Sequence, residues 1–267
     1  MQRVRACQCE VALCTPEGVH LDLDNLPLIN AHLCHAIRPG DTVLYHGCGT
    51  GILGMLALRL GASFIHFADV DGASVRAAGE TARANGYVEG DTWAASAHDL
   101  LGDAPVCGER AFTLLLCNPP QMAGPEELAS SRPDKYAGPD GLLFYRRLIE
   151  LARRQRVARC AFMQTSLSSF AAVDSALADA GYRAVTLGTQ RRTVAAAAVE
   201  ALAEGTLAHV EALRAAGGAA FESDGDGLIE YAQRIVLGCA EAGAPLAADA
   251  SARRDEAELP PAAAASG

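Results

Sequence analysis

The chain has 267 residues, half of them apolar, and a formal net charge of -10 from 32 acidic and 22 basic residues. This length fits one α/β domain with additions, and the apolar fraction is enough for a substantial core. A surface with this net charge repels a polyphosphate, and the basic residues form only short groups such as residues 153–156. We therefore expect no nucleic-acid partner.

The cysteines and the apolar runs indicate a cytoplasmic protein. There are nine cysteines, irregularly spaced and mostly inside apolar runs, as buried free thiols are in a reducing compartment. No pair-of-pairs spacing suggests a metal site, and we expect none. The one close pair, Cys7 and Cys9, is expected in a mobile N-terminal segment. No signal peptide is expected at the start, and no run of about 18 apolar residues predicts a membrane span.

The predicted elements change character near residue 40. Strand-like pieces at 11–13 and 19–21 and a helix-like stretch at 26–37 precede Arg38-Pro39-Gly40-Asp41, which breaks the pattern. Strands are then predicted at 42–45, 63–68, 92–95, 112–117, 160–163 and 182–187, and helices at 52–60, 73–85, 141–158 and 173–180. This alternation predicts a Rossmann-like, doubly wound α/β sheet of about seven mostly parallel strands with helices on both faces.

The last third of the chain adds an insertion and a tail to this pattern. Residues 193–217 are helical and alanine-rich, and a final strand is predicted at 228–239. Residues 243–267 combine alanine, proline and charge without periodicity, which predicts disorder. We therefore expect a short N-terminal segment at 1–40, a domain at 41–242 with a helical insertion near 193–217, and a disordered tail at 243–267.

A glycine loop follows the first strand of the domain and opens the next helix. Its sequence is Tyr45-His46-Gly47-Cys48-Gly49-Thr50-Gly51. Glycines allow a tight turn and let a ligand lie directly against the backbone. Taken alone, the same pattern also fits a strand-to-helix turn that binds nothing.

Acidic residues end the next two strands. Asp69 lies 18 positions after Gly51 and could accept both hydroxyls of a ribose, with Val70 directly after it. His98 and Asp99 follow the third strand, where a carboxylate could accept a hydrogen bond from an adenine amino group. A helix N-cap is the alternative role for Asp99. A dinucleotide-binding fold would share the glycine loop and Asp69.

The fourth predicted strand ends in Asn118-Pro119-Pro120-Gln121. The prolines fix φ and leave carbonyls with fewer local donors, so Asn118 would present an amide oxygen and a rigid carbonyl at one point in space. Such a pair of acceptors can hold an N–H group and direct the lone pair of its nitrogen. A proline-rich loop with a capping asparagine is the structural alternative.

In this order, the four motifs resemble those of class I S-adenosylmethionine-dependent methyltransferases. Asn118-Pro119-Pro120 resembles the signature of the amino and amide N-methyltransferases, including the N5-glutamine enzymes that act on release factors, and residues 139–149 resemble the stretch that follows it there. The resemblance implies S-adenosylmethionine as cofactor, with its methionine part on the glycine loop, its ribose at Asp69 and its adenine near Asp99. The expected cofactor contacts are Tyr45, Gly47, Cys48, Gly49, Gly51, Asp69, Val70, His98, Asp99 and Asn118.

Three features depart from this family. Tyr45 stands where an acid usually receives the cofactor's amino group, and Gln121 stands where an aromatic residue usually stacks on the substrate. About 40 residues precede the glycine loop, too few for the N-terminal domain of the glutamine enzymes. These departures favour a small polar metabolite over a release factor as substrate, in secondary metabolism.

Two further segments are candidates for contact with a substrate. Residues 123–140 could form an active-site flap hinged at Gly138 and Gly141, or an ordinary surface loop. Gln164, Thr165 and Ser166 end the fifth predicted strand, although Ser166 could instead cap a helix. The substrate-binding residues expected from these observations are Gln121, Tyr136, Gln164 and Ser166.

The sequence thus predicts methyl transfer to a nitrogen, or a sulfur, of a small polar metabolite, with Asn118, Pro119 and Gln121 as catalytic residues. One alternative keeps the cofactor and cyclises it to azetidine-2-carboxylate and methylthioadenosine. A second is a protein glutamine N-methyltransferase, and a third is a binding module without catalysis. The sequence does not predict an oligomeric state.

Overall fold

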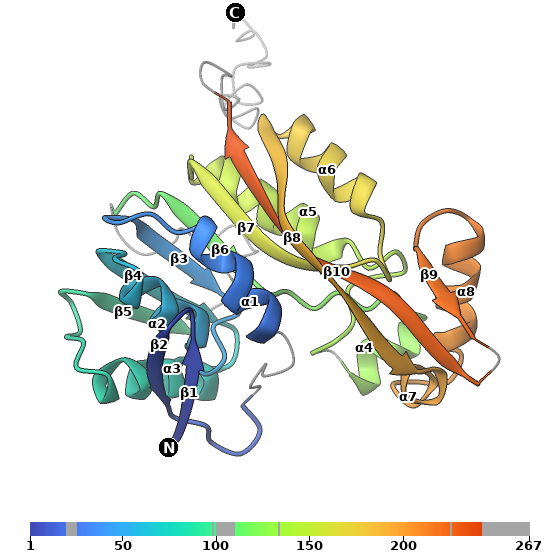
Figure 1. Cartoon of the computed structure of the whole chain (residues 1–267), viewed down its shortest axis with the longest axis horizontal. Helices are drawn as coiled ribbons and strands as arrows, with labels where there is room; N and C mark the ends of the chain where they lie inside the picture. Colours follow the sequence, from blue (N-terminus) through green and yellow to red (C-terminus); the bar gives the residue numbers. More distant parts are fainter. Residues whose placement is uncertain (20–25, 98, 100–109, 133, 225, 242–267) are drawn as a thin grey trace, which may run out of the picture.

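An eight-stranded sheet forms the centre of the molecule (Figure 1). The computed structural model describes residues 1–19, 26–97, 99, 110–132, 134–224 and 226–241. The strand order is β5-β4-β3-β6-β7-β10-β8, and β9 pairs with β10 beside this path. The strands are β3 (Thr42–His46), β4 (Phe64–Asp69), β5 (Trp93–Ala97), β6 (Leu114–Cys117), β7 (Arg159–Thr165), β8 (Tyr182–Ala195), β9 (Phe221–Ser223) and β10 (Leu228–Ala240).

Strands β5, β4, β3, β6 and β7 are parallel neighbours, and β10 enters antiparallel between β7 and β8. The predicted Rossmann-like, mostly parallel sheet is therefore confirmed. The strands β3, β4 and β6 are almost entirely buried, as continuous apolar strands are when helices cover both faces of a sheet. Because parallel strands end at one edge, the residues that follow β3, β4 and β6 come together there.

Helices cover both faces of this sheet, and each face has its own buried core. One core contains side chains of α1 (Leu26–His32), α2 (Ile52–Arg59) and α3 (Gly72–Ala84). The other contains side chains of α5 (Leu143–Arg154) and α6 (Phe170–Asp179). Within the residues described above, no helix has both the length and the apolar character that a membrane crossing requires.

The N-terminal residues form an ordered hairpin rather than the expected mobile segment. Strands β1 (Gln2–Ala6) and β2 (Cys9–Leu13) pair antiparallel, and the turn residues Cys7 and Gln8 have φ of 50° and 61°. Positive φ at both turn residues matches the right-handed twist of a two-residue hairpin. Val4 and Val11 of this hairpin are buried in the first core. A short 3-10 helix (Leu33–His35) follows α1, while most of the strand predicted at 19–21 lies outside the described residues.

The strands β8 and β10 extend past the sheet edge as a long antiparallel pair (Figure 1). β8 continues eight residues beyond the strand predicted at 182–187, and helices α7 (Ala196–Glu200) and α8 (Thr206–Ala215) follow it. A third, smaller core packs α7, α8 and β9 on the end of this pair through Val199, Val210, Phe221 and Ile229. The helices thus lie within the range predicted for the insertion, and the tail predicted at 243–267 lies outside the described residues.

A buried ion pair joins three strands at the opposite edge of the sheet. The guanidinium of Arg159, in β7, contacts the carboxylate of Asp41, and both side chains are only 6% exposed. The Thr113 hydroxyl donates to Asp41 at 2.7 Å, and Arg159 also donates to the Ala36 carbonyl at 2.5 Å. Burial alone would raise the pKa of Asp41, but the hydrogen bonds from Arg159, the Arg38 amide and Thr113 outweigh it and lower that pKa.

Replacing Arg159 by methionine tests the contribution of this pair to stability. The variant leaves a buried carboxylate without its cation, and the free energy of unfolding is expected to fall by about 3 to 5 kcal/mol. Urea denaturation measures the change. Because the pKa of Asp41 is lowered on folding, the loss is fully present at neutral pH and shrinks as the pH falls below the carboxyl's ordinary value of 3.8.

Arg3→Met is the matched control, because Arg3 pairs with Glu10 on the surface, where the two side chains are 78% and 49% exposed. An exposed pair contributes about 1 kcal/mol or less. Equal losses in the two variants would show that burial does not set the strength of the Arg159 pair.

Candidate active site

The glycine loop connects β3 to α2 with an unusual backbone. Gly47, Gly49 and Gly51 have φ of 66°, 48° and 83°, values in the left-handed region that glycine adopts without strain. A Cβ on Gly51 would lie 3.0 Å from Ala78 Cα, so this glycine also permits the close approach of α3. The loop is further fixed by hydrogen bonds from the Cys48 amide to the Ala68 carbonyl at 3.1 Å and from the Gly51 amide to the Cys48 carbonyl at 2.7 Å.

Asp69, at the end of β4, lies beside this loop and is hydrogen-bonded to it. One carboxylate oxygen accepts from the Gly49 amide at 3.1 Å, and the other accepts from the Asp71 amide at 3.0 Å. Each oxygen has a second lone pair, so the carboxylate retains the capacity to accept two hydroxyl groups. The next residue, Val70, is 67% exposed, an isolated apolar side chain beside the predicted ribose position.

Asp71 has a structural role in this region that is not among the sequence predictions. Its carboxylate accepts from the amides of Ala73 at 3.0 Å and Ser74 at 2.9 Å and so caps the N-terminus of α3. These hydrogen bonds lower the pKa of Asp71. An aspartate directly before the first residue of a helix signals this capping role, which holds Asp69 and Val70 at the strand end.

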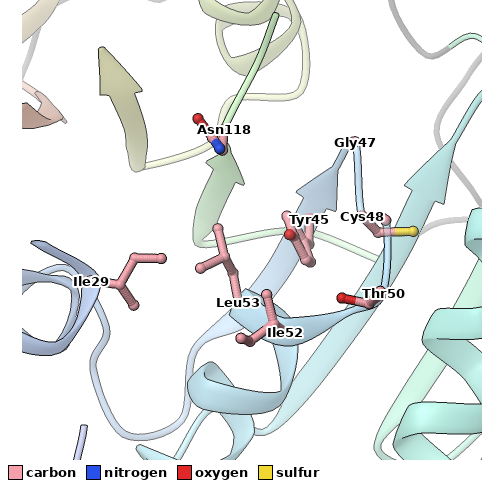
Figure 2. Close-up of a pocket in the computed structure, with 9 residues that line it drawn as sticks. Ile29, Tyr45, Gly47, Cys48, Thr50, Ile52, Leu53 and Asn118 are labelled. Atoms are coloured by element: carbon pink, nitrogen blue, oxygen red, sulfur yellow. The ribbon is translucent and has the colours of Figure 1, made fainter. Parts of the chain in front are cut away.

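A pocket lies over the glycine loop and reaches the end of β6 (Figure 2). It is lined by Ile29, Tyr45, Gly47, Cys48, Gly49, Thr50, Ile52, Leu53 and Asn118. Ile29 comes from α1, and no sequence motif indicates its role because its place in the pocket depends on tertiary packing. Tyr45 is only 4% exposed and packs its ring near that of Phe67, with centroids 6.3 Å apart. These lining residues include no charged side chain, so a ligand's ammonium group would meet neutral oxygens.

Two buried cysteines lie next to the pocket. Burial, and secondarily the charge of Asp69, raises the pKa of the thiols of Cys48 and Cys117 far above the ordinary value. Both therefore remain protonated at neutral pH and are poor nucleophiles. Among the residues that the structure describes, no cluster of three or more histidine, cysteine or acidic side chains is arranged to hold a metal ion.

Asn118 follows β6 and is held by Gln121. The Gln121 Nε2 donates to Asn118 Oδ1 at 3.3 Å, while Gln121 Oε1 accepts from the Thr165 amide at 2.7 Å. The Tyr145 hydroxyl lies 3.1 Å from the same Oε1 and 2.7 Å from the Met163 carbonyl. Both the Nε2 and the Oε1 of Gln121 thus form hydrogen bonds within the protein. In this structure the side chain contacts other residues of the chain, whereas the sequence predicted that it would bind substrate.

The segment predicted as a flap pairs its later residues with Met122, the residue that directly follows the Asn118 motif. Met122 and Tyr136 form a parallel bridge, the Met122 amide donates to the Lys135 carbonyl at 2.9 Å, and helix α4 (Glu126–Ser131) lies in between. Gly141 has φ of 72°, and a Cβ there would lie 3.0 Å from the Gln121 carbonyl oxygen. Gly141 is therefore in close packing contact with the Gln121 backbone, and its role as a hinge stays a prediction.

Two hydrogen bonds join this segment to the helices that follow β8. The Ser131 hydroxyl donates to the Leu202 carbonyl at 3.1 Å, and the His209 Nε2 lies 2.6 Å from the Pro139 carbonyl. The described residues of the 121–141 region are therefore joined by hydrogen bonds to the 196–215 region.

Two of the expected substrate-binding residues have their polar groups taken by the protein. Gln164 is fully buried, and its Oε1 accepts from Arg234 at 2.8 Å and 3.0 Å. The Ser166 hydroxyl contacts the Ala220 carbonyl and accepts from the Ala232 amide at 2.9 Å. We therefore correct both assignments: these side chains hold β7 to β10 and to the segment before β9.

The predicted adenine site is only partly described. His98 lies outside the described residues, and Asp99 is exposed. Their contacts with adenine, like the N-cap alternative for Asp99, stay predictions.

A segment that makes up about a third of the chain is similar to a known family. The family model described as "Ribosomal protein L11 methyltransferase (PrmA)" matches residues 28–118. The ribosomal protein L11 methyltransferase of Dechloromonas aromatica is 36% identical over 106 residues, which are 38% of this chain and 32% of that protein. The one from Porphyromonas gingivalis is 40% identical over 91 residues, 34% of this chain and 29% of that protein. The chain thus spans a third or less of the length of these curated relatives.

One solved structure has a similar fold. The YcgJ protein from Bacillus subtilis has a TM-score of 0.50 at 11% identity, over 78% of this chain and 94% of that one. The segment that matches the family model begins in α1 and ends at Asn118, so it contains the glycine loop, Asp69 and all the residues that line the pocket. The part of this chain that is similar to the ribosomal protein L11 methyltransferases is therefore the part that carries the pocket.

Gly51→Ala is expected to weaken cofactor binding. The added Cβ would lie 3.0 Å from Ala78 Cα and would displace the loop from α3. Calorimetric titration with S-adenosylhomocysteine should show at least about a tenfold loss of affinity, or about 1.4 kcal/mol.

Gly86→Ala provides the control, because Gly86 has nearly the same φ, 84°, and open space around its Cβ position. It should lower stability by about 1 kcal/mol through backbone strain and leave the affinity unchanged. A Gly51→Ala protein that binds as tightly as the Gly86→Ala protein would contradict the placement of the cofactor.

Proposed function

We propose that this protein is an S-adenosylmethionine-dependent methyltransferase that modifies a nitrogen of a polypeptide. The observation that carries the proposal is that Asn118 and the glycine loop line one pocket. The glycines of the loop let a cofactor lie directly against the backbone, and Asn118 provides hydrogen-bond acceptors at the edge of the pocket. Donor and acceptor would then meet where the pocket reaches the end of β6.

The residues present fit the cofactor. The glycine backbone at 47–51 would take the methionine part, the free lone pairs of Asp69 would accept the ribose hydroxyls, and the exposed Val70 would cover the adenine. The Tyr45 hydroxyl and nearby carbonyls would hold the amino group without a charge. The bound cofactor supplies an electrophilic methyl group on a sulfonium.

The contribution of the protein is then mainly alignment. The amide oxygen of Asn118 and the carbonyl of Pro119 would accept the N–H groups of the acceptor and direct its lone pair along the line of the breaking C–S bond. When bound, the cofactor would supply the methyl group and keep the C–S electron pair on its sulfur, and the proton lost by the acceptor nitrogen would pass to solvent. The protonated thiols of Cys48 and Cys117 take no part in this step.

The relatives favour a polypeptide as acceptor. Their names specify methylation of a ribosomal protein, and none of these matches supports the small polar metabolite or the role in secondary metabolism that the sequence favoured. The glutamine side-chain amide is one acceptor within this class, and an amine is another. The regions 121–141 and 196–215, which hydrogen bonds join, lie beyond the matched residues. Their contacts with the acceptor would therefore set which polypeptide is modified.

Transfer of a labelled methyl group tests the proposal. The purified chain is incubated with S-adenosylmethionine labelled in the methyl group and with separated protein and small-molecule fractions of a cell extract. We expect S-adenosylhomocysteine to form together with label on a nitrogen of a protein, located by mass spectrometry. Label found in the small-molecule fraction alone would overturn the polypeptide acceptor, and methylthioadenosine formed without any acceptor would support cyclisation instead.

Asn118→Ala should reduce turnover far more than it reduces cofactor affinity. Loss of the orienting oxygen misplaces the acceptor, which is expected to lower kcat about 100-fold, while the Kd for S-adenosylhomocysteine changes by about threefold or less. Steady-state kinetics and calorimetry provide the two values.

Asn85→Ala serves as the control. The Asn85 side chain donates to the carbonyls of Ala12 and Thr81 and so joins α3 to the N-terminal hairpin, away from the pocket. It should lower stability and leave kcat unchanged. Unchanged turnover in Asn118→Ala would refute the role of Asn118.

A further inference from the structure

The carboxamide of Gln121 has a fixed orientation. The backbone N–H of Thr165 can only donate, and it lies 2.7 Å from one end of this carboxamide, so that end must be the oxygen Oε1. The Nε2 group therefore occupies the other end, 3.3 Å from the side-chain oxygen of Asn118. Two hydrogen bonds in series thus connect the backbone of β7 to the Asn118 side chain.

The groups around Gln121 are themselves buried and constrained. Tyr145 is fully buried, and its single hydroxyl proton is shared between the Met163 carbonyl and Gln121 Oε1. Gly141 lies so close to the Gln121 carbonyl oxygen that a Cβ would be 3.0 Å away. Since α5, β7 and the 137–141 turn all contribute, the position of Gln121 is set by the fold and not by a ligand.

This arrangement has a consequence for Asn118. An unrestrained asparagine can turn its carboxamide by half a rotation and exchange its oxygen for its amino group at little cost. Because Gln121 Nε2 can only donate, it favours the one orientation of the Asn118 carboxamide in which Oδ1 points toward Gln121. A carboxamide oxygen has two lone pairs, and the one not directed at Gln121 is the one that would accept an N–H group of the acceptor.

We propose that Gln121 is a positioning residue that fixes which atom of the Asn118 side chain faces the acceptor. The inference rests on the proposed methyl transfer and revises the expected catalytic and substrate-binding role of Gln121. The Asn-Pro-Pro enzymes that this chain resembles usually have an aromatic residue here, which stacks on the substrate. In this chain the position acts through Asn118, by hydrogen bonding.

Gln121→Glu tests the inference with almost no change in shape. The carboxylate still accepts from the Thr165 amide, so this support of the side chain remains. The second oxygen of the new carboxylate, however, faces Asn118 and repels its Oδ1. The carboxamide of Asn118 therefore turns, so that its amino group donates to the carboxylate and its oxygen points away from position 121. We expect kcat to fall about 10-fold to 100-fold, with the Kd for S-adenosylhomocysteine within about threefold of the original value.

A double-mutant cycle separates positioning from a general structural effect. If Gln121 acts through Asn118, then Gln121→Glu causes no further loss of kcat in a chain that already has Asn118→Ala. Losses that multiply in the double variant would overturn the inference, as would an unchanged kcat in Gln121→Glu.

Nuclear magnetic resonance gives a readout that does not depend on activity. In ¹⁵N-labelled protein, Gln121→Glu should move the side-chain NH₂ resonances of Asn118, while the backbone amide of Thr165 stays hydrogen-bonded and slow to exchange. An unmoved Asn118 signal would overturn the inference. If the unmodified chain forms no S-adenosylhomocysteine, the proposed function fails, and this measurement still decides whether Gln121 orients Asn118.

Discussion

The candidate site depends on the attachment of the glycine loop to the end of β4. The Gly49 amide donates to the Asp69 carboxylate, and the Cys48 amide donates to the Ala68 carbonyl. These two bonds place the loop backbone beside the Asp69 carboxylate. The start of α2 then lies so close to α3 that only a glycine fits at position 51. The pocket, the predicted ribose position and the border with Asn118 all follow from this attachment.

Asn118 lies at the boundary between a part of the chain that is similar to a known family and a part that is not matched by it. Residues 28–118 match the model of the ribosomal protein L11 methyltransferases and carry the pocket. After Asn118, Gln121 is hydrogen-bonded to β7, Met122 forms a bridge with Tyr136, and the long β8–β10 pair is followed by the helices α7 and α8. Hydrogen bonds between Ser131 and Leu202 and between His209 and Pro139 join these additions to each other. We propose that the matched part binds the methyl donor and that the second part selects the acceptor.

Local sequence was enough to predict the parts of the site that one turn or one strand end determines. The glycine loop, Asp69 and Asn118 each follow a buried apolar strand, so their meeting at one sheet edge is a consequence of parallel topology. The length of β8 was missed because its polar residues alternate with half-buried ones and resemble no core strand. Gln164 and Ser166 were misassigned because position at a strand end does not show what occupies a side chain, and Gln164 is taken by Arg234, 70 residues later. The role of Gln121 likewise depends on Thr165, 44 residues away.

The central claim is that the β3–α2 loop and the end of β6 form the cofactor site. The most direct measurement is a titration of ¹⁵N-labelled protein with S-adenosylhomocysteine, followed by backbone amide resonances. We expect saturable shifts at Gly47, Gly49, Gly51, Val70 and Asn118, with the amides of α7 and α8 unmoved. Absence of saturable binding, or shifts confined to the β8–β10 end, would contradict it.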